Sequence, residues 1–246
     1  MTVRINDHRI DTGHASLFAR TWTPDRPQCD THAAILLFHD SLGCVKLWRD
    51  FPERLAESTQ RIVVAYDRLG FGFSDAHPGP LPLSFIGDEA ARVTPLLCDS
   101  LRLNTIVPFG HSVGGVMAIA TAALLPDRCS AVVTEAAQSF VEERTLDGLR
   151  SAGKRFEQPG QLERLARYHG PKARWVLDAW IETWLAPSFA QWRLDDELRQ
   201  VRCPVLAMHG DRDEFGSTRH PGTDRQPRPR ACANRDSQRL RPCSAS

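Results

Sequence analysis

Short, continuous apolar runs recur along the chain and are separated by longer segments with helical spacing. A continuous apolar run is typical of a strand that is buried on both faces, as in a parallel sheet covered by helices. The runs occupy residues 33–38, 62–66, 105–109, 131–133 and 204–208, and the predicted helices between them cover about 46–58, 84–101 and 113–125. This alternation predicts an α/β fold with a mostly parallel sheet flanked by helices.

Other local patterns refine this prediction. Residues 9–22 alternate loosely around Gly13, which predicts an antiparallel hairpin at one edge of the sheet. Pro95 lies inside the predicted helix 84–101 and should kink or divide it, because proline lacks the amide N–H that a helix interior needs. Pro126 marks the end of the helix that begins at residue 113.

Residues 138–195 break the alternation and contain no candidate strand. Amphipathic spacing at 162–168 and 175–185 predicts helices, so we expect a helical lid inserted between two strands. Four of the six tryptophans gather in this segment: Trp175, Trp180, Trp184 and Trp192. Aromatic side chains at helical spacing usually pack inward, so we expect them in the core of the lid rather than against a substrate.

The segment Gly110-His111-Ser112-Val113-Gly114 joins the run 105–109 to the helix that follows it. A serine between small residues, in a strand–turn–helix context, is the pattern called a nucleophile elbow. Such a turn places the hydroxyl at a helix N-terminus, whose free N–H groups stabilise a developing negative charge. The alternative is an ordinary glycine-rich turn, and the flanking strand and helix favour the elbow.

Polar or glycine-rich sequence follows three of the predicted strands, at 39–43, 67–74 and 209–214. Ligands of open α/β sheets bind at the carboxyl ends of the strands, where these segments meet. Because of these segments and the elbow, residues 14–217 resemble the α/β-hydrolase superfamily, in particular small cytoplasmic serine hydrolases with a helical lid. We therefore expect an α/β-hydrolase fold with core segments 1–137 and 196–217, a lid at 138–195 and a separate tail at 218–246.

The resemblance assigns the site residues. It places the nucleophile at Ser112 and the catalytic acid at Asp213, and it forms the oxyanion hole from the backbone N–H groups of Val113 and Ser41. Asp40 departs from the family pattern, which usually has glycine there, and its carboxylate would oppose negative charge near the oxyanion hole. A serine rather than an aspartate at the elbow argues against the dehalogenase and epoxide-hydrolase branches.

Alternatives remain for the acid. Asp211 and Glu135 are the other candidates, although the family spacing favours Asp213. His39 and His209 close strands and are interpreted as structural, and His111 as a packing or hydrogen-bonding residue.

The family's histidine base should follow the acid on a loop after an eighth strand, and a final helix should follow. His220 is the only histidine after Asp213. It lies directly before a proline, where the family begins a helix, so it is not assigned as the base. Removing the histidine of a triad costs on the order of a millionfold in rate.

Residues 218–246 have a different composition from the rest of the chain. From residue 219 onward, seven arginines and two aspartates give a net charge of +5, which leaves −4 for the rest of a chain whose total is +1. Arginine, proline, serine, alanine and cysteine dominate, which is typical of disorder. We interpret the tail as the product of truncation or of a shifted reading frame near residue 218, with the final strand and helix missing. A basic tail that binds nucleic acid or another acidic surface is the alternative.

Composition bounds the remaining possibilities. At 246 residues, with 41% hydrophobic and 25% charged residues, the chain is expected to be a soluble globular protein. It has no apolar run near the roughly 18 residues that span a bilayer. The first residues lack the apolar core of a secretory signal, and seven scattered cysteines suggest reduced thiols in the cytoplasm. We expect a small-molecule substrate, no cofactor or metal, no membrane and no nucleic acid, and the oligomeric state stays open.

Two functions follow from these residues. The first is a serine hydrolase that cleaves a carboxylic ester, or a related carbonyl-adjacent bond, through an acyl-Ser112 intermediate. The second is a catalytically silent remnant, or a binding protein, with a hydrolase body that lacks its catalytic histidine.

Limited proteolysis tests the interpretation of the tail. Because a disordered basic segment offers many accessible cleavage sites, trypsin is expected to trim the chain to a stable fragment that ends near residue 217. The fragment is identified by intact mass. A stable fragment that ends beyond residue 240 would contradict a disordered tail.

Overall fold

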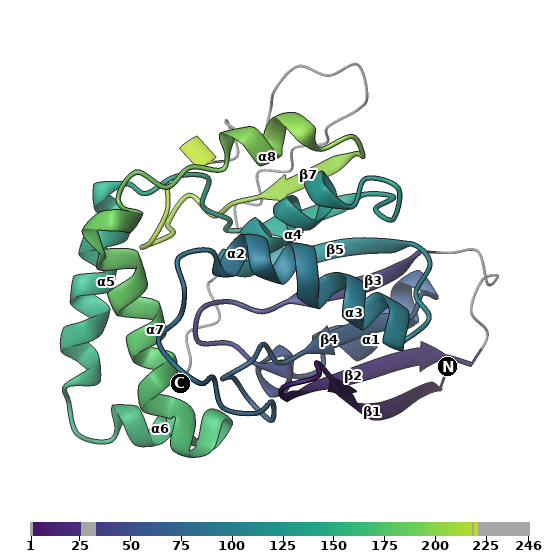
Figure 1. The fold of residues 1–246 in the computed structure, drawn as a ribbon, viewed down its shortest axis with the longest axis horizontal. Coiled ribbons are helices and arrows are strands. Elements are labelled where there is room, and N and C mark those ends of the chain that lie inside the picture. Colours follow the sequence, from purple (N-terminus) through teal and green to yellow (C-terminus); the bar gives the residue numbers. More distant parts are fainter. Residues whose placement is uncertain (1, 26–32, 218, 221–246) are drawn as a thin grey trace.

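The computed structural model describes residues 2–25, 33–217, 219 and 220, and these residues form one seven-stranded sheet (Figure 1). The strand order is β1-β2-β4-β3-β5-β6-β7. The pairs β1–β2 and β2–β4 are antiparallel, and the other pairs are parallel. The strands are β1 Val3–Asp11, β2 Ser16–Pro24, β3 Ala34–Phe38, β4 Val63–Tyr66, β5 Ile106–His111, β6 Val132–Glu135 and β7 Val205–Met208. The predicted hairpin and the predicted parallel strands are confirmed.

Helices cover both faces of the sheet. Along β3, Leu36 and Phe38 belong to the hydrophobic cluster formed with α4, while Ile35 and Leu37 belong to the cluster on the side of α1. Successive side chains of a strand point to opposite faces, so a strand buried on both sides must be apolar throughout. The helices around the sheet are α1 Phe51–Thr59, α2 Phe85–Asp88, α3 Thr94–Ser100, α4 Val113–Leu124 and α8 Asp195–Gln200.

Pro95 divides its helix as expected. The segment runs from α2 through a π-helical turn, Glu89–Val93, into α3, and Pro95 lies in the first turn of α3. Proline has no N–H to donate to a carbonyl of the preceding turn, so the regular α-helical bonding is interrupted at this position. The π turn accommodates the break without separating the two helices.

Three further helices lie between β6 and α8 and form a layer beside one end of the sheet (Figure 1). They are α5 Glu143–Phe156, α6 Gln161–His169 and α7 Ala173–Leu185. The helices expected at 162–168 and 175–185 are therefore present as α6 and α7. The sequence did not single out α5 or α8, whose residues are mostly polar and charged.

The buried His169 fixes this helical layer to two loops of the sheet. Its Nδ1 accepts a hydrogen bond from the Gly72 N–H at 2.9 Å, and its Nε2 donates to the Leu42 carbonyl at 2.9 Å. Burial lowers the pKa of His169 to about 4, which keeps the ring neutral and able to make both bonds. Lys172 adds a bond to the Gly72 carbonyl at 2.9 Å.

The turn from β5 to α4 brings two backbone segments unusually close together. A Cβ atom on Gly110 would lie 2.0 Å from the Gly114 carbonyl oxygen, and one on Gly114 would lie 2.1 Å from the Phe38 carbonyl oxygen. Ser112 between them has φ 54° and ψ −126°, a backbone conformation that costs a non-glycine residue roughly 1–3 kcal/mol. The glycines are required because α4 begins in contact with the ends of β3 and β5.

The expected absence of a final strand and helix falls on residues that are not described. After β7 the structure describes the chain to Ser217, together with Arg219 and His220. Within these residues β7 pairs with β6 alone. The expectations for the tail 218–246 otherwise lie outside the described residues.

Substituting Gly114 tests the close approach of α4 to β3. Gly114→Ala is expected to lower the free energy of unfolding by about 1–3 kcal/mol, because its methyl group would overlap the Phe38 carbonyl. Gly87→Ala is the matched control: Gly87 lies in α2, and a Cβ there meets no atom within 4 Å. Urea unfolding should show the control unchanged or slightly more stable. Equal stability of the two variants would contradict this account of the turn.

Candidate active site

Ser112 is held at the carboxyl edge of the sheet by its backbone. Its N–H donates to the Glu135 carbonyl at 2.8 Å, and its carbonyl accepts from the Gly115 N–H at 2.8 Å. It occupies the N-cap position of α4 without a capping hydrogen bond from its side chain. Within the described residues Oγ has no hydrogen-bond partner, so the turn presents a hydroxyl that is not committed to the fold.

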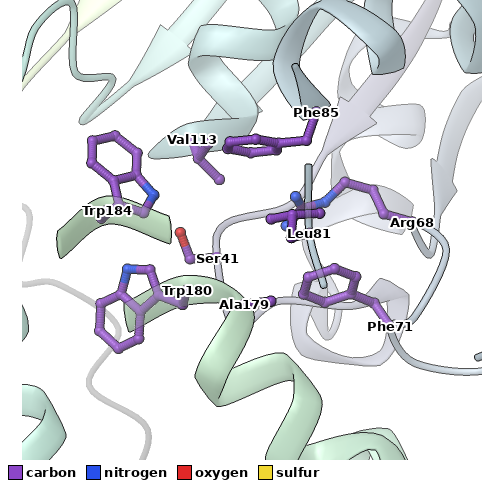
Figure 2. A pocket seen from close by; sticks show the side chains of 9 residues that line it. All are labelled: Ser41, Arg68, Phe71, Leu81, Phe85, Val113, Ala179, Trp180 and Trp184. Atoms are coloured by element: carbon purple, nitrogen blue, oxygen red, sulfur yellow. The ribbon is translucent and has the colours of Figure 1, made fainter. Parts of the chain in front are cut away.

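A small cavity joins the two residues that were predicted to form the oxyanion hole. Ser41, in the loop after β3, and Val113, the first residue of α4, both line it (Figure 2). The rest of the lining is Arg68, Phe71, Leu81, Phe85, Ala179, Trp180 and Trp184. Its open volume of about 10 Å³ is on the order of one water position. A larger ligand enters only if the side chains contributed by α7 move aside.

The tryptophans were expected in the core of the helical layer; Trp180 and Trp184 pack there and also line this cavity. Trp184 also packs edge-on against Phe189, so one side chain serves both roles. Trp192 stacks on Phe189 instead. Helical spacing shows only that a side chain points toward the interior of the protein. It does not distinguish a side chain in the packed core from one that lines an interior cavity.

Asp40 and His111 form an ion pair beside the cavity, with Asp40 Oδ2 3.4 Å from His111 Nδ1. Burial opposes protonation of His111, but the hydrogen bond and charge of Asp40, with the charges of Glu135 and Asp213, outweigh it and raise the pKa of the imidazole. Burial alone would raise the pKa of Asp40, yet the bond to His111 lowers it. The Asp40 carboxylate, expected to oppose an oxyanion, therefore lies beside an imidazole whose protonated form it favours.

The carboxylate of Asp213 is fixed by the loop after β7. Its Oδ1 accepts hydrogen bonds from the N–H groups of Phe215 at 2.8 Å and Gly216 at 3.2 Å. Its Oδ2 lies 3.5 Å from Nε2 of His209. Both ring nitrogens of His209 are buried and have no hydrogen-bond partner within the described residues.

Asp211 and Glu135, the other candidates for the catalytic acid, lie in different parts of the structure. Asp211 is exposed in the turn after β7. Glu135 ends β6 directly opposite His111, and its carbonyl holds the Ser112 N–H. Both Glu135 and Asp213 contribute negative charge around His111.

His220 is bound by residues other than Ser112. Its Nε2 lies 3.0 Å from Glu142 Oε1, its Nδ1 accepts from the Ser139 N–H at 3.2 Å, and its ring packs on Phe140. Burial lowers the pKa of this histidine. In the part of the chain that the structure describes, no histidine forms a hydrogen bond with Ser112 Oγ.

Sequence reasoning missed Arg68 as a residue of the site. Its Nη2 donates to the Asp40 carbonyl at 2.8 Å, and its Nε donates to His39 Nε2 at 3.3 Å. Burial and the charge of Arg68 lower the pKa of His39, which therefore stays neutral and accepts this bond. The sequence offered one indication that Arg68 belongs to the site. It comes directly after β4 and Asp67, in a segment expected at the ligand-binding edge of the sheet.

Comparison with known proteins bears on this fold and site together. The profile of the alpha/beta hydrolase fold matches residues 33–171, which is more than half of the chain. The chain belongs to the alpha/beta hydrolase family. The matched residues contain β3, β4, β5 and β6, the loop with Asp40 and Ser41, and the turn at Ser112.

Several curated proteins are similar to the chain. Mouse serine hydrolase BPHL is 28% identical over 193 residues, which are 73% of this chain and 63% of that protein. A putative 2-succinyl-6-hydroxy-2,4-cyclohexadiene-1-carboxylate synthase of Bacillus subtilis is 29% identical over 171 residues, 68% of this chain and 56% of that one. The chain thus spans less than two thirds of the length of these relatives.

Solved structures of the alpha/beta hydrolase fold superpose on most of the chain. The 2-hydroxy-6-oxo-6-phenylhexa-2,4-dienoate hydrolase of Rhodococcus sp. strain RHA1 gives a TM-score of 0.68 at 21% identity, over 90% of this chain and 86% of that one. At this identity the likeness shows the fold. Among the described helices none is long and apolar enough to cross a membrane, and the described residues hold no cluster of three or more candidate metal ligands.

Titration of His111 tests the ion pair with Asp40. Histidine NMR is expected to show His111 titrating above the usual imidazole range, and Asp40→Asn is expected to lower its pKa. Because the pKa of His111 is raised and that of Asp40 lowered by folding, the pair stabilises the fold most between about pH 4 and 6.5. That contribution fades as the pH rises through the raised pKa of His111. Asp99→Asn, which removes the remote partner of Arg128, is the control. An unchanged His111 titration in Asp40→Asn would refute the pairing.

Proposed function

We propose that the chain is a serine hydrolase that cleaves a carboxylic ester, or a related carbonyl-adjacent bond, through an acyl-Ser112 intermediate. The observation that carries the proposal is the turn at Ser112, interpreted as a nucleophile elbow. Ser112 has a strained positive φ, caps α4 and has an uncommitted hydroxyl, and the glycines beside it are required by contact. The mouse relative is named a serine hydrolase, which supports the same chemistry.

The proposed reaction follows from this placement. Ser112 Oγ attacks the substrate carbonyl carbon, and the oxyanion forms beside the cavity wall that Val113 and Ser41 share. We assign the backbone N–H groups of these two residues as its donors, because hydrogen bonds from fixed donors stabilise the tetrahedral oxyanion. The ester C–O bond then breaks, and the alcohol leaves with the proton that the Ser112 hydroxyl lost. Water cleaves the acyl–Oγ bond, which releases the carboxylic acid and restores the Ser112 hydroxyl.

Asp213 is proposed as the carboxylate of the catalytic machinery. Its fixed Oδ1 and its position after β7 support this assignment over the exposed Asp211. The segment 138–195 is proposed as a lid over the site, since Ala179, Trp180 and Trp184 of α7 line the cavity.

The second candidate function is a catalytically silent binding protein. One observation favours it: within the described residues no histidine hydrogen-bonds to Ser112 Oγ, and His220 bonds to Glu142 and Ser139. A serine without a base is a weak nucleophile at neutral pH. Such a protein would bind a small molecule in the same cavity and release it unchanged.

Labelling with a fluorophosphonate separates these two functions. The hydrolase is expected to take up one probe, located on Ser112 by peptide mass spectrometry, and to hydrolyse p-nitrophenyl butyrate. Ser112→Ala should abolish labelling and lower kcat by a factor of 10³ or more. Ser84→Ala, at an exposed serine that bonds only its neighbour Asp88 in the described structure, is the control and should keep both. A folded wild-type protein that neither labels nor turns over would establish the silent alternative.

A further inference from the structure

Arg68 places a buried positive charge on the wall of the cavity. The side chain follows β4, is 4% exposed and lines the same space as Ser41 and Val113. Figure 2 shows it reaching toward the cavity beside Leu81. Its guanidinium carbon lies over the Phe71 ring, 4.2 Å from the ring centre, in a cation–π contact.

The hydrogen bonds of Arg68 leave one of its nitrogens available. Nε donates to His39, and Nη2 donates to the Asp40 carbonyl. Nη1 makes no hydrogen bond within the described residues, and part of its surface remains accessible. The cavity is the open space that Arg68 borders, so Nη1 can donate to a ligand there.

The positive charge of Arg68 is not neutralised by a carboxylate in contact with it. Among the described residues no acidic oxygen lies within 4.0 Å of the guanidinium, and Asp40 directs its carboxylate to His111. Glu89 acts on Arg68 at longer range; burial raises the pKa of Glu89, and its oxygen accepts a bond from the Tyr66 hydroxyl at 2.7 Å. A buried cation without a carboxylate in contact is costly, and an anion that pairs with it directly reduces this cost.

We propose that Arg68 binds a carboxylate group of the substrate, so that the favoured substrates are apolar esters that also carry a free carboxylate. The assignment as an ester rests on the proposed function, whereas the binding of the carboxylate does not require Ser112 to react. Apolar walls from Phe71, Leu81 and Phe85 would hold the hydrocarbon part of such a molecule. The carboxylate would pair with Arg68 while the ester carbonyl lies beside Ser41 and Val113.

Arg68 also holds the loop that carries Ser41, through its bonds to His39 and Asp40. This positioning role and the proposed recognition role differ in a measurable way. Loss of the loop geometry weakens the binding of every ligand of the cavity. Loss of the positive charge weakens the binding of anions selectively.

The first experiment compares two ligands of nearly the same shape on the wild-type protein. Calorimetry is expected to show that 3-phenylpropionate binds at least about tenfold more tightly than the neutral 3-phenylpropionamide, as a charge-assisted hydrogen bond predicts. Equal or weaker binding of the carboxylate would overturn the proposal. No variant is needed for this comparison, so a folding defect cannot obscure it.

The second experiment removes the charge. Arg68→Met is expected to lose the preference for the carboxylate over the amide, beyond any loss that both ligands share through the loop, while Arg68→Lys keeps part of the preference. Arg128→Met, which removes an arginine paired with Asp99 outside the cavity, should retain the full preference. A parallel loss of both ligands in Arg68→Met would assign Arg68 to positioning alone and overturn the proposal.

The same titrations on Ser112→Ala distinguish this inference from the proposed function. Carboxylate preference should persist in that variant, because Arg68 and not Ser112 provides it. If the preference persists and the wild-type protein takes up no fluorophosphonate, hydrolysis is refuted while recognition by Arg68 stands. If labelling occurs without any preference, recognition is refuted and hydrolysis stands.

Discussion

The backbone contact between α4 and the strands beneath it determines most of this structure. Gly114 lies against the Phe38 carbonyl and Gly110 against the Gly114 carbonyl, at distances that exclude any Cβ atom. The chain can pass from β5 into α4 this tightly only if Ser112 adopts a positive φ. The same contact sets the depth at which α4 lies on the sheet. Three residues of the candidate site are positioned from there, because Ser112 and Val113 begin α4 and Asp40 follows the strand that α4 touches.

Charge is distributed around this turn in a definite way. Asp40 and His111 compensate each other on one side of the cavity, and the Asp213 carboxylate is held by backbone N–H groups of its own loop. Arg68 differs, since its hydrogen bonds go to neutral acceptors and its charge has no carboxylate in contact within the described residues. In an otherwise apolar cavity, one charge of this kind dominates the selection of ligands, because desolvated electrostatic interactions are stronger than exposed ones.

The helical layer between β6 and α8 restricts access to the cavity. His169 bonds this layer to the loops that carry Gly72 and Leu42, and Trp180 and Trp184 form part of the cavity wall. The remaining space is about the size of one water position. Binding of any organic ligand therefore requires part of this layer to move, while the sheet and α4 stay in place. Conformational change in this protein is thus expected to concentrate in α7 and the loops it touches.

The sequence by itself determined the strands, the helices of the sheet and the turn at Ser112, because these depend on local spacing: apolar runs buried on both faces, and glycines flanking one serine. It did not reveal the partners of Asp40 and Arg68. Asp40 meets His111 because β3 and β5 pair in parallel with Phe38 opposite Gly110, a register fixed by the assembled sheet. Arg68 faces the cavity because β4 lies beside β3 and because α7, more than a hundred residues later in the chain, forms the opposite wall of the cavity. Whether a polar side chain is paired or left open to a cavity depends on such distant segments, and only the tertiary structure decided it.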